Sequence, residues 1–276
     1  MAAFKLILVH LDDTPRAALR LDTALALAAS HQAHLVALNV RSRSNLSPLL
    51  IGQFGSEMEA LLAKSDTESA ARAKALLESR PVPAGVTVEW RDVSGDLADS
   101  IALHARYSDL VVVGQASPED EETAPLAELL LLSVGRPVLV LPYAGEFPVL
   151  GQRIMVGWNA SREATRAVND AMPLLEQADI VQVVIVNPGH GNSGHGDVPG
   201  ADICQYLSRH GVSAVCESIQ SEDLNVGEML LNRAADEDSD LIVMGGYGRS
   251  RFSELVLGGA TRHLLAHMTV PVLLSH

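Results

Sequence analysis

A glycine-rich segment near the C-terminus has the composition of a phosphate-binding loop. It follows the apolar run DLIVM and carries glycines in the pattern G-x2-G-x9-G-G, at Gly245, Gly248, Gly258 and Gly259. Glycine lets the main chain approach a ligand closely. The last two glycines precede a helical pattern, whose free N–H groups and dipole favour an anion. A turn that only joins a strand to a helix is the alternative interpretation.

Side chains around these glycines add to the phosphate interpretation. Thr261 offers a hydroxyl group, and positive charge comes from Arg249, Arg251 and Arg262. The segment is not a Walker loop, which needs Gly-Lys-Ser/Thr, because the second half of the chain contains no lysine. We also find no G-x-S-x-G turn, kinase signature or paired carboxylates with a base. We therefore expect no dedicated catalyst, and weak ATP hydrolysis at most.

The chain is an internal repeat, and this repeat sets the domain boundaries. The segment 5–14, KLILVHLDDT, resembles 152–161, QRIMVGWNAS, which places Asp12 opposite Asn159. Two further pairs of segments match in the same order along each half: 108–114, SDLVVVG, with 239–245, SDLIVMG, and 136–142, RPVLVLP, with 270–276, VPVLLSH. We predict two domains, 1–145 and 151–276, joined by a Gly/Pro-bearing linker. The first domain has about sixteen extra residues between its second strand and the later motif.

Apolar, β-branched runs alternate with helical patterns in each half, which is typical of a parallel sheet covered by helices on both faces. Ligands of such sheets bind beyond the carboxyl ends of the strands, at a topological switch point. In the second half we predict the strands 153–158, 180–187, 213–219, 240–245 and 270–274, and the helices 161–176, 201–210, 226–237 and 258–267.

The first half has lost the glycine loop. After Gly114, the other glycine positions are taken by Ser117, Ala124 and Pro125, and the run 119–122 contains four consecutive acids, which would repel phosphate. We therefore predict one nucleotide per chain, bound in the second half, although Asp12 remains in the first.

Composition and charge restrict the other functions. The formal net charge is -14, which counts against binding to nucleic acid or to an anionic membrane. The apolar stretch 126–141 is too short and too interrupted to span a bilayer. Cys204 and Cys216 lack metal-site spacing, so we expect neither a disulfide framework nor a cysteine zinc site. We expect a cytoplasmic protein. His190 and His195 lie in a Gly-rich segment that is either a surface loop or a cover for the nucleotide.

The chain resembles the universal stress protein family over nearly its whole length. The resemblance rests on four features taken together: the repeat unit, the polar turn after the first strand, the glycine spacing and the terminal x-P-V-L-x strand. The resemblance implies an α/β fold: two tandem five-stranded parallel-sheet sandwiches, of the adenine nucleotide α-hydrolase-like or Rossmann-like type. It also implies that the last strands of the two halves, 138–141 and 272–274, pair antiparallel as an intramolecular pseudo-dimer. A homodimer is a further arrangement that the apolar edge strands allow.

The resemblance implies an adenine-nucleotide site, because family members with this motif bind ATP. The phosphate loop then comprises Gly245, Gly248, Gly258 and Gly259, while Asn159 replaces the family's adenine-side Asp. The remaining candidate binding residues lie beside these positions: Val186, Asn187, Met244, Arg249, Ala260 and Thr261. Two positions depart from the family pattern. Asn159 carries no charge, and Gly259 stands where the family has Ser or Thr, so a phosphate-contacting hydroxyl is missing unless Thr261 supplies it.

These observations predict an ATP- or ADP-binding sensor or regulator of the stress response, with Mg²⁺ as an ion that can accompany the nucleotide and with unknown protein partners. A nucleotide-free scaffold of the same fold, acting through protein contacts, is the alternative. An α-hydrolase-type enzyme fits less well, because no S-G-G-x-D-S loop follows the first strand.

Overall fold

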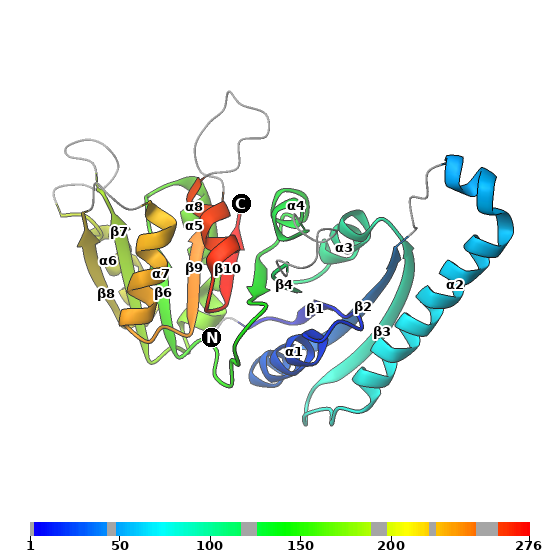
Figure 1. Cartoon of the computed structure of the whole chain (residues 1–276). Helices are drawn as coiled ribbons and strands as arrows, with labels where there is room; N and C mark the ends of the chain where they lie inside the picture. The colour runs from blue at the N-terminus through cyan, green and yellow to red at the C-terminus, as the bar shows by residue number, and fades with distance from the viewer. Residues whose placement is uncertain (1–2, 43–47, 117–125, 189–197, 221–224, 247–258) are drawn as a thin grey trace. The chain divides into compact units, whose positions relative to one another are not determined.

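The computed structural model describes residues 3–42, 48–116, 126–188, 198–220, 225–246 and 259–276. These residues form two compact units, one of residues 4–114 and one of residues 115–276 with Ala3. Both units alternate strands with helices (Figure 1).

The unit of residues 4–114 is a parallel sheet in the order β3-β2-β1-β4. Its buried strands are short apolar runs, as the sequence predicts. α2 spans 31 residues with a non-helical break at Gly55, whereas its counterpart α6 in the second half has 9, so the extra residues of the first half lengthen this helical segment. The elements are β1 (Leu6–His10), α1 (Ala17–His31), β2 (His34–Ser42), α2 (Pro48–Glu78), β3 (Thr87–Gly95), α3 (Leu97–Ala105) and β4 (Leu110–Gly114).

The unit of residues 115–276 has the strand order β5-β10-β9-β6-β7-β8. Its elements are α4 (Leu126–Ser133), β5 (Val138–Leu141), β6 (Arg153–Gly157), α5 (Arg162–Leu175), β7 (Ile180–Val186), α6 (Ala201–Arg209), β8 (Ala214–Ile219), α7 (Val226–Asp236), β9 (Leu241–Gly245), α8 (Gly259–His267) and β10 (Val272–Ser275). The boundaries predicted from the sequence agree with these bounds to within two residues.

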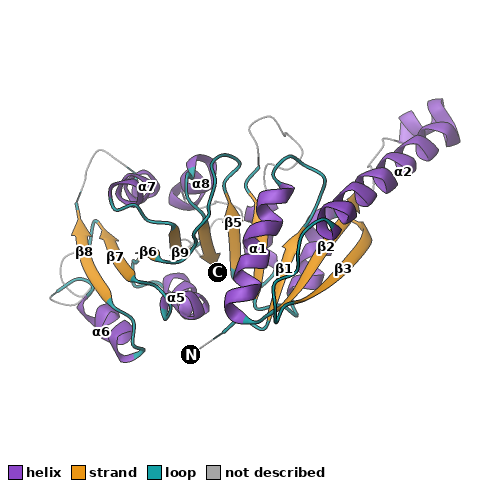
Figure 2. Ribbon diagram, turned by 90° about the horizontal axis from the view of Figure 1, so that it is seen from below, coloured by secondary structure: helices purple, strands orange, loops and turns teal. Residues whose placement is uncertain are grey.

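In this second unit, helices cover both faces of the sheet. α5 and α6 lie on one face of the sheet, and α7 and α8 lie on the other (Figure 2). The core is formed by strands that are buried along nearly their whole length, such as β9 and β10. The predicted antiparallel pairing of β5 with β10 is confirmed, with Leu139 opposite Leu273. The other pairings described in this unit are parallel.

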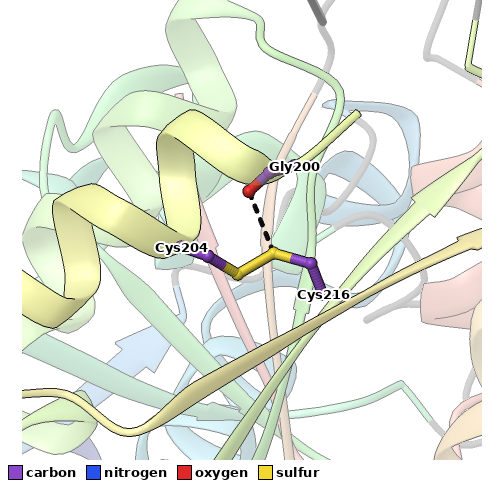
Figure 3. Close-up of a disulfide and its surroundings, with 3 residues drawn as sticks. All are labelled: Gly200, Cys204 and Cys216. Carbon is purple, nitrogen blue, oxygen red and sulfur yellow. Dashed lines mark hydrogen bonds between the residues drawn. A yellow bond between two sulfur atoms is a disulfide. The ribbon is translucent and has the colours of Figure 1, made fainter. Parts of the chain in front are cut away.

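The structure corrects the expectation that the cysteines form no disulfide. Cys204 of α6 is bonded to Cys216 of β8, with 6.5 Å between the two Cα atoms (Figure 3). The expectation was wrong because sequence spacing does not reveal that a helix lies directly over the neighbouring edge strand, within the Cα separation that a disulfide needs. Among the helices of the described residues, none has the length and apolar character required to cross a membrane.

Candidate functional site

The topological switch point of the second unit lies between β6 and β9. From β6 the chain proceeds outward through β7 to β8, whereas from β9 it proceeds the other way to β10. Gly157, the last residue of β6, is in register with Met244 of β9. The carboxyl ends of two adjacent strands that diverge in this way form the crevice where such sheets bind ligands. Asn159 and Gly245, the residues singled out in the sequence, follow or end these two strands.

Asn159 lies in a tight turn between β6 and α5. Its side-chain Oδ1 accepts a hydrogen bond from the N–H of Ser161 at 3.1 Å, and Ala160 between them has φ +56°. Ser161 in turn caps α5, because its Oγ accepts from the N–H of Ala164. Asn159 is exposed, and its oxygen is engaged in the turn, so the Nδ2 amino group is the donor that it can offer a ligand.

The end of β7 lies next to the switch point. Val184 of β7 is in register with Gly157, and Val186 is the last residue of the strand. Asn187 follows with φ +49°, and its main-chain N–H donates to the carbonyl of Ile219 at 2.8 Å. Val186 and Asn187 therefore lie at the same edge of the sheet as Asn159.

The glycine at the end of β9 is needed for packing. A Cβ atom on Gly245 would overlap the main-chain atoms of Glu163 and Ala164 in the first turn of α5. One on Gly246 would overlap the side chain of Leu131. The N–H of Gly246 donates to the carbonyl of Ser275 at 2.8 Å, which holds β9 against the end of β10. The first glycine of the motif thus has a structural role whether or not it contacts a ligand.

The far end of the glycine loop is the start of α8. Gly248, Arg249 and Gly258 lie outside the described residues. Gly259 is exposed, and a Cβ atom placed on it would have no neighbour within 4 Å. Ala260 is half-buried. Thr261 is buried, with 3% of its surface exposed.

The corresponding edge of the first unit is occupied by an arginine from its own chain. Arg20 of α1 is 5% exposed and donates from Nε to the carbonyl of His10 at 2.7 Å and from Nη2 to Asp12 Oδ1 at 2.6 Å. Thr14 also donates to Asp12 Oδ1, from its N–H and its hydroxyl. A Cβ atom on Gly114, at the end of β4, would lie 2.6 Å from Arg20 Nη1. The guanidinium thus fills the space between the ends of β1 and β4.

The charges in this cluster are mutually compensated. Burial raises the pKa of Asp12, but Arg20, His10 and the Thr14 hydrogen bonds outweigh it, and the net shift is downward. Burial, with the nearby charge of Arg20, lowers the pKa of His10 to about 4, although its Nδ1 lies 3.8 Å from Asp12 Oδ2. His10 is therefore neutral at pH 7, and Asp12 already has a cationic partner.

Among the described residues of the second unit, no arginine or lysine is buried as Arg20 is. With Asp12 opposite Asn159, the position of Arg20 corresponds to Ala167, which is buried in α5. Arg20 was not among the residues predicted from the sequence to be functional. Its signal was a lone basic residue within an otherwise apolar helix stripe, eight residues after Asp12, and that arginine has no counterpart in the second repeat.

A small pocket adjoins the turn that carries Asn159. It lies between α5 and α6, has a volume of about 210 Å³, and is lined mostly by apolar surface from Trp158, Val168, Asn169, Ile203 and Tyr206. The hydroxyl of Tyr206 donates to Asn169 Oδ1 at 2.9 Å and bridges the two helices. The sequence analysis did not single out these residues, because helix positions facing a neighbouring helix look like ordinary core.

The described residues contain no group of three or more His, Cys, Asp or Glu side chains that could hold a metal ion. The rings of His263 and His267 stack on α8 with centroids 4.3 Å apart. His190 and His195 lie outside the described residues.

Comparison with known proteins identifies the family. The family model of universal stress proteins matches residues 3–140 and, a second time, residues 151–276. The chain belongs to the universal stress protein family. Both halves of this universal stress protein thus match the family separately, as the internal repeat predicts.

Solved structures support the fold of this universal stress protein. A universal stress protein from Archaeoglobus fulgidus DSM 4304 superposes with a TM-score of 0.68 at 16% identity, covering 98% of this chain and 95% of that one. A protein described as a universal stress protein from Pseudomonas aeruginosa UCBPP-PA14 gives 0.64 at 19% identity, covering 99% and 93%. A search of curated proteins found no match. The predicted fold class is confirmed.

Proposed function

We propose that this universal stress protein binds one adenine nucleotide, ATP or ADP, in its second domain, residues 151–276, and acts as a cytoplasmic sensor or regulator rather than as an enzyme. The observation that carries the proposal is the switch point. There the ends of β6, β7 and β9 meet, and β9 runs directly into the glycine-rich segment. The proposed contacts are Asn159, Val186 and Asn187 on the adenine–ribose side.

The start of α8 fits the phosphates in this proposal. The open space at Gly259 leaves room for a phosphate group beside the N-terminus of a nine-residue helix. The N–H groups of such a terminus attract anions. The other contacts of the phosphate side are Met244, Gly245, Gly248, Arg249, Gly258, Ala260 and Thr261. Mg²⁺, when present, would be held mainly by the phosphates and water, as is usual for this ion.

A nucleotide-free scaffold remains the second candidate, because three observations favour it. Gly245 is required by its packing against α5, Thr261 is buried, and Asn159 is uncharged. Each of these removes or weakens one reason for expecting a ligand. The scaffold would act through protein partners whose chemistry these observations leave open.

Titration calorimetry with ATP and ADP separates the two candidates. The wild-type chain should bind with millimolar affinity or better, and Gly248→Val should weaken binding at least about tenfold, because a branched side chain blocks the approach of phosphate to the main chain. Ser117→Val, at the equivalent position of the first half, is the matched control and should leave binding unchanged. Absence of binding to the wild type at millimolar nucleotide would favour the scaffold.

A further inference from the structure

The disulfide between Cys204 and Cys216 includes none of the residues proposed to bind nucleotide. It joins the first turns of α6 to the middle of β8 (Figure 3). These are the only cysteines of the chain, so no other pairing can form within it. Both residues are half-buried, which leaves the bond within reach of a small reagent. Accessible disulfides are the ones that exchange with thiols.

The disulfide connects a short helix with few buried residues to an edge strand, which is paired along its length with β7. α6 has nine residues and buries only Ile203 and Leu207, whereas α5 buries eight of its fourteen. None of the six residues of β8 is buried, and β8 is the last strand in the order of its unit. Segments with few buried apolar contacts open at low free energy. The covalent link therefore adds to the few buried contacts and the Tyr206–Asn169 hydrogen bond that hold α6 on the sheet.

The geometry around Cys216 also accommodates the reduced state. Gly200, the N-cap of α6, has φ +86°, and its carbonyl oxygen lies 3.0 Å from Cys216 Sγ. A free thiol at Cys216 can donate a hydrogen bond to that oxygen. A Cβ atom on Gly200 would lie 3.1 Å from Cys216 Sγ and 2.7 Å from Ile185 Cδ1, so the helix start and the sulfur are in direct contact. Both oxidation states thus have a partner for Cys216.

We propose that Cys204 and Cys216 form a reversible thiol–disulfide exchange site, which takes a low-molecular-weight thiol or its disulfide as co-reactant and controls how firmly α6 is held. In reduction, a reagent thiolate attacks one protein sulfur, the S–S bond breaks, and the other cysteine leaves as a thiolate and takes a proton. A second reagent thiol resolves the mixed disulfide, so that two electrons pass to the protein and the reagent becomes a disulfide. Oxidation by the disulfide form of such a reagent is the reverse reaction.

The consequence for the molecule is a change in the pocket between α5 and α6. Ile203 and Tyr206, on either side of Cys204 in sequence, line this pocket opposite Trp158 and Asn169. When the link is cut, α6 should separate more readily, the Tyr206–Asn169 hydrogen bond should weaken, and Trp158 should become more accessible to water. In a reducing compartment, disulfides are usually transient and redox-sensing.

Alkylation of the native full-length protein with mass spectrometry tests the exchange. Protein equilibrated with oxidised glutathione should incorporate no alkyl group, and protein treated with dithiothreitol should incorporate two. Return to oxidised glutathione should restore the unlabelled state. Two thiols that stay free in oxidised glutathione would overturn the proposal, and so would a disulfide that resists dithiothreitol while the protein remains folded.

Hydrogen exchange tests the structural consequence. Reduction should speed exchange of the α6 amides at least about tenfold and leave those of α5 unchanged. The matched control is the Cys204→Ser, Cys216→Ser variant, which should exchange at the reduced rate with or without dithiothreitol. If that variant does not fold, the same comparison is made on wild type before and after reduction. If the α6 amides exchange at equal rates in the oxidised and the reduced protein, the proposal that the disulfide determines how firmly α6 is held would be overturned. Neither readout involves a nucleotide, so the result is independent of the proposed function.

Discussion

At the scale of single residues, the two repeats differ most at the polar turn after their first strand. In the first repeat, Asp12 is bound by Arg20 at 2.6 Å, and the neighbouring His10 is buried and neutral. In the second repeat, Asn159 is exposed, and the position equivalent to Arg20 is taken by the buried Ala167. A carboxylate already paired inside the protein has little to gain from a ligand, whereas an exposed amide still has a donor to offer.

The buried His10 predicts a decline of stability in mild acid. Its pKa is about 4 in the folded protein against 6.5 for the free group, so between these values the unfolded chain binds more protons. The stabilisation is complete above pH 6.5 and is lost as the pH falls toward 4. From pH 7.5 to pH 5 we expect a loss of about 2 kcal/mol in the free energy of unfolding, measured by urea denaturation.

His10→Gln is the control for this prediction, because it removes the titrating group. The variant should lose most of the dependence on pH in this range. A smaller slope should persist, since burial and Lys5 also lower the pKa of His31. Asp12, with its pKa lowered from 3.8, contributes only at lower pH. An equal slope in both proteins would show that His10 has the same pKa in the folded and the unfolded chain, and would contradict the lowered pKa.

At the scale of the elements, the sequence predicts most of the sheet because parallel strands are buried on both faces and read as continuous apolar runs. β9 and β10 are of this kind. The disulfide and the arginine cluster could not be predicted, because both depend on distances between elements. Cys204 lies twelve residues from Cys216, a spacing that indicates no bond until α6 is placed over β8.

The same distinction applies to the glycines of the candidate site. Gly245 and Gly259 belong to the same sequence motif, but their structural surroundings differ. A Cβ atom on Gly245 would overlap the main chain of α5, and one on Gly259 would meet open space. The sequence pattern shows where glycines recur. Why a position requires glycine is seen only from the atoms that surround it in the structure.

We therefore expect opposite effects when alanine replaces these two glycines. Gly245→Ala should lower the free energy of unfolding by about 2 kcal/mol, because the rigid main chain of Glu163 and Ala164 has to move. Gly259→Ala should be neutral or stabilise the protein by up to about 1 kcal/mol, since alanine is the better helix former. Chemical denaturation measures both. Equal effects of the two substitutions would contradict the close packing of β9 against α5.

At the scale of the whole molecule, the formal net charge is -14, so the proposed binding of an anionic nucleotide requires local positive charge and main-chain donors. The first half lacks the glycines of the loop and has Arg20 committed to Asp12. The second half keeps the glycine spacing, together with Arg249, Arg251 and Arg262. Duplication of the fold thus need not duplicate the proposed nucleotide site. One half can carry this site while the other half has a structural role only.

The expected stoichiometry is consequently one nucleotide per chain. Asn159→Ala should weaken binding about fivefold, which corresponds to the loss of one hydrogen bond worth about 1 kcal/mol. Asp12→Asn, the matched variant of the first half, keeps an acceptor for Arg20 and should change neither affinity nor stoichiometry. Calorimetry of the three proteins measures both quantities. A stoichiometry of two in the wild type that falls to one in Asp12→Asn would mean that Arg20 releases Asp12 to a ligand, and that both repeats bind nucleotide.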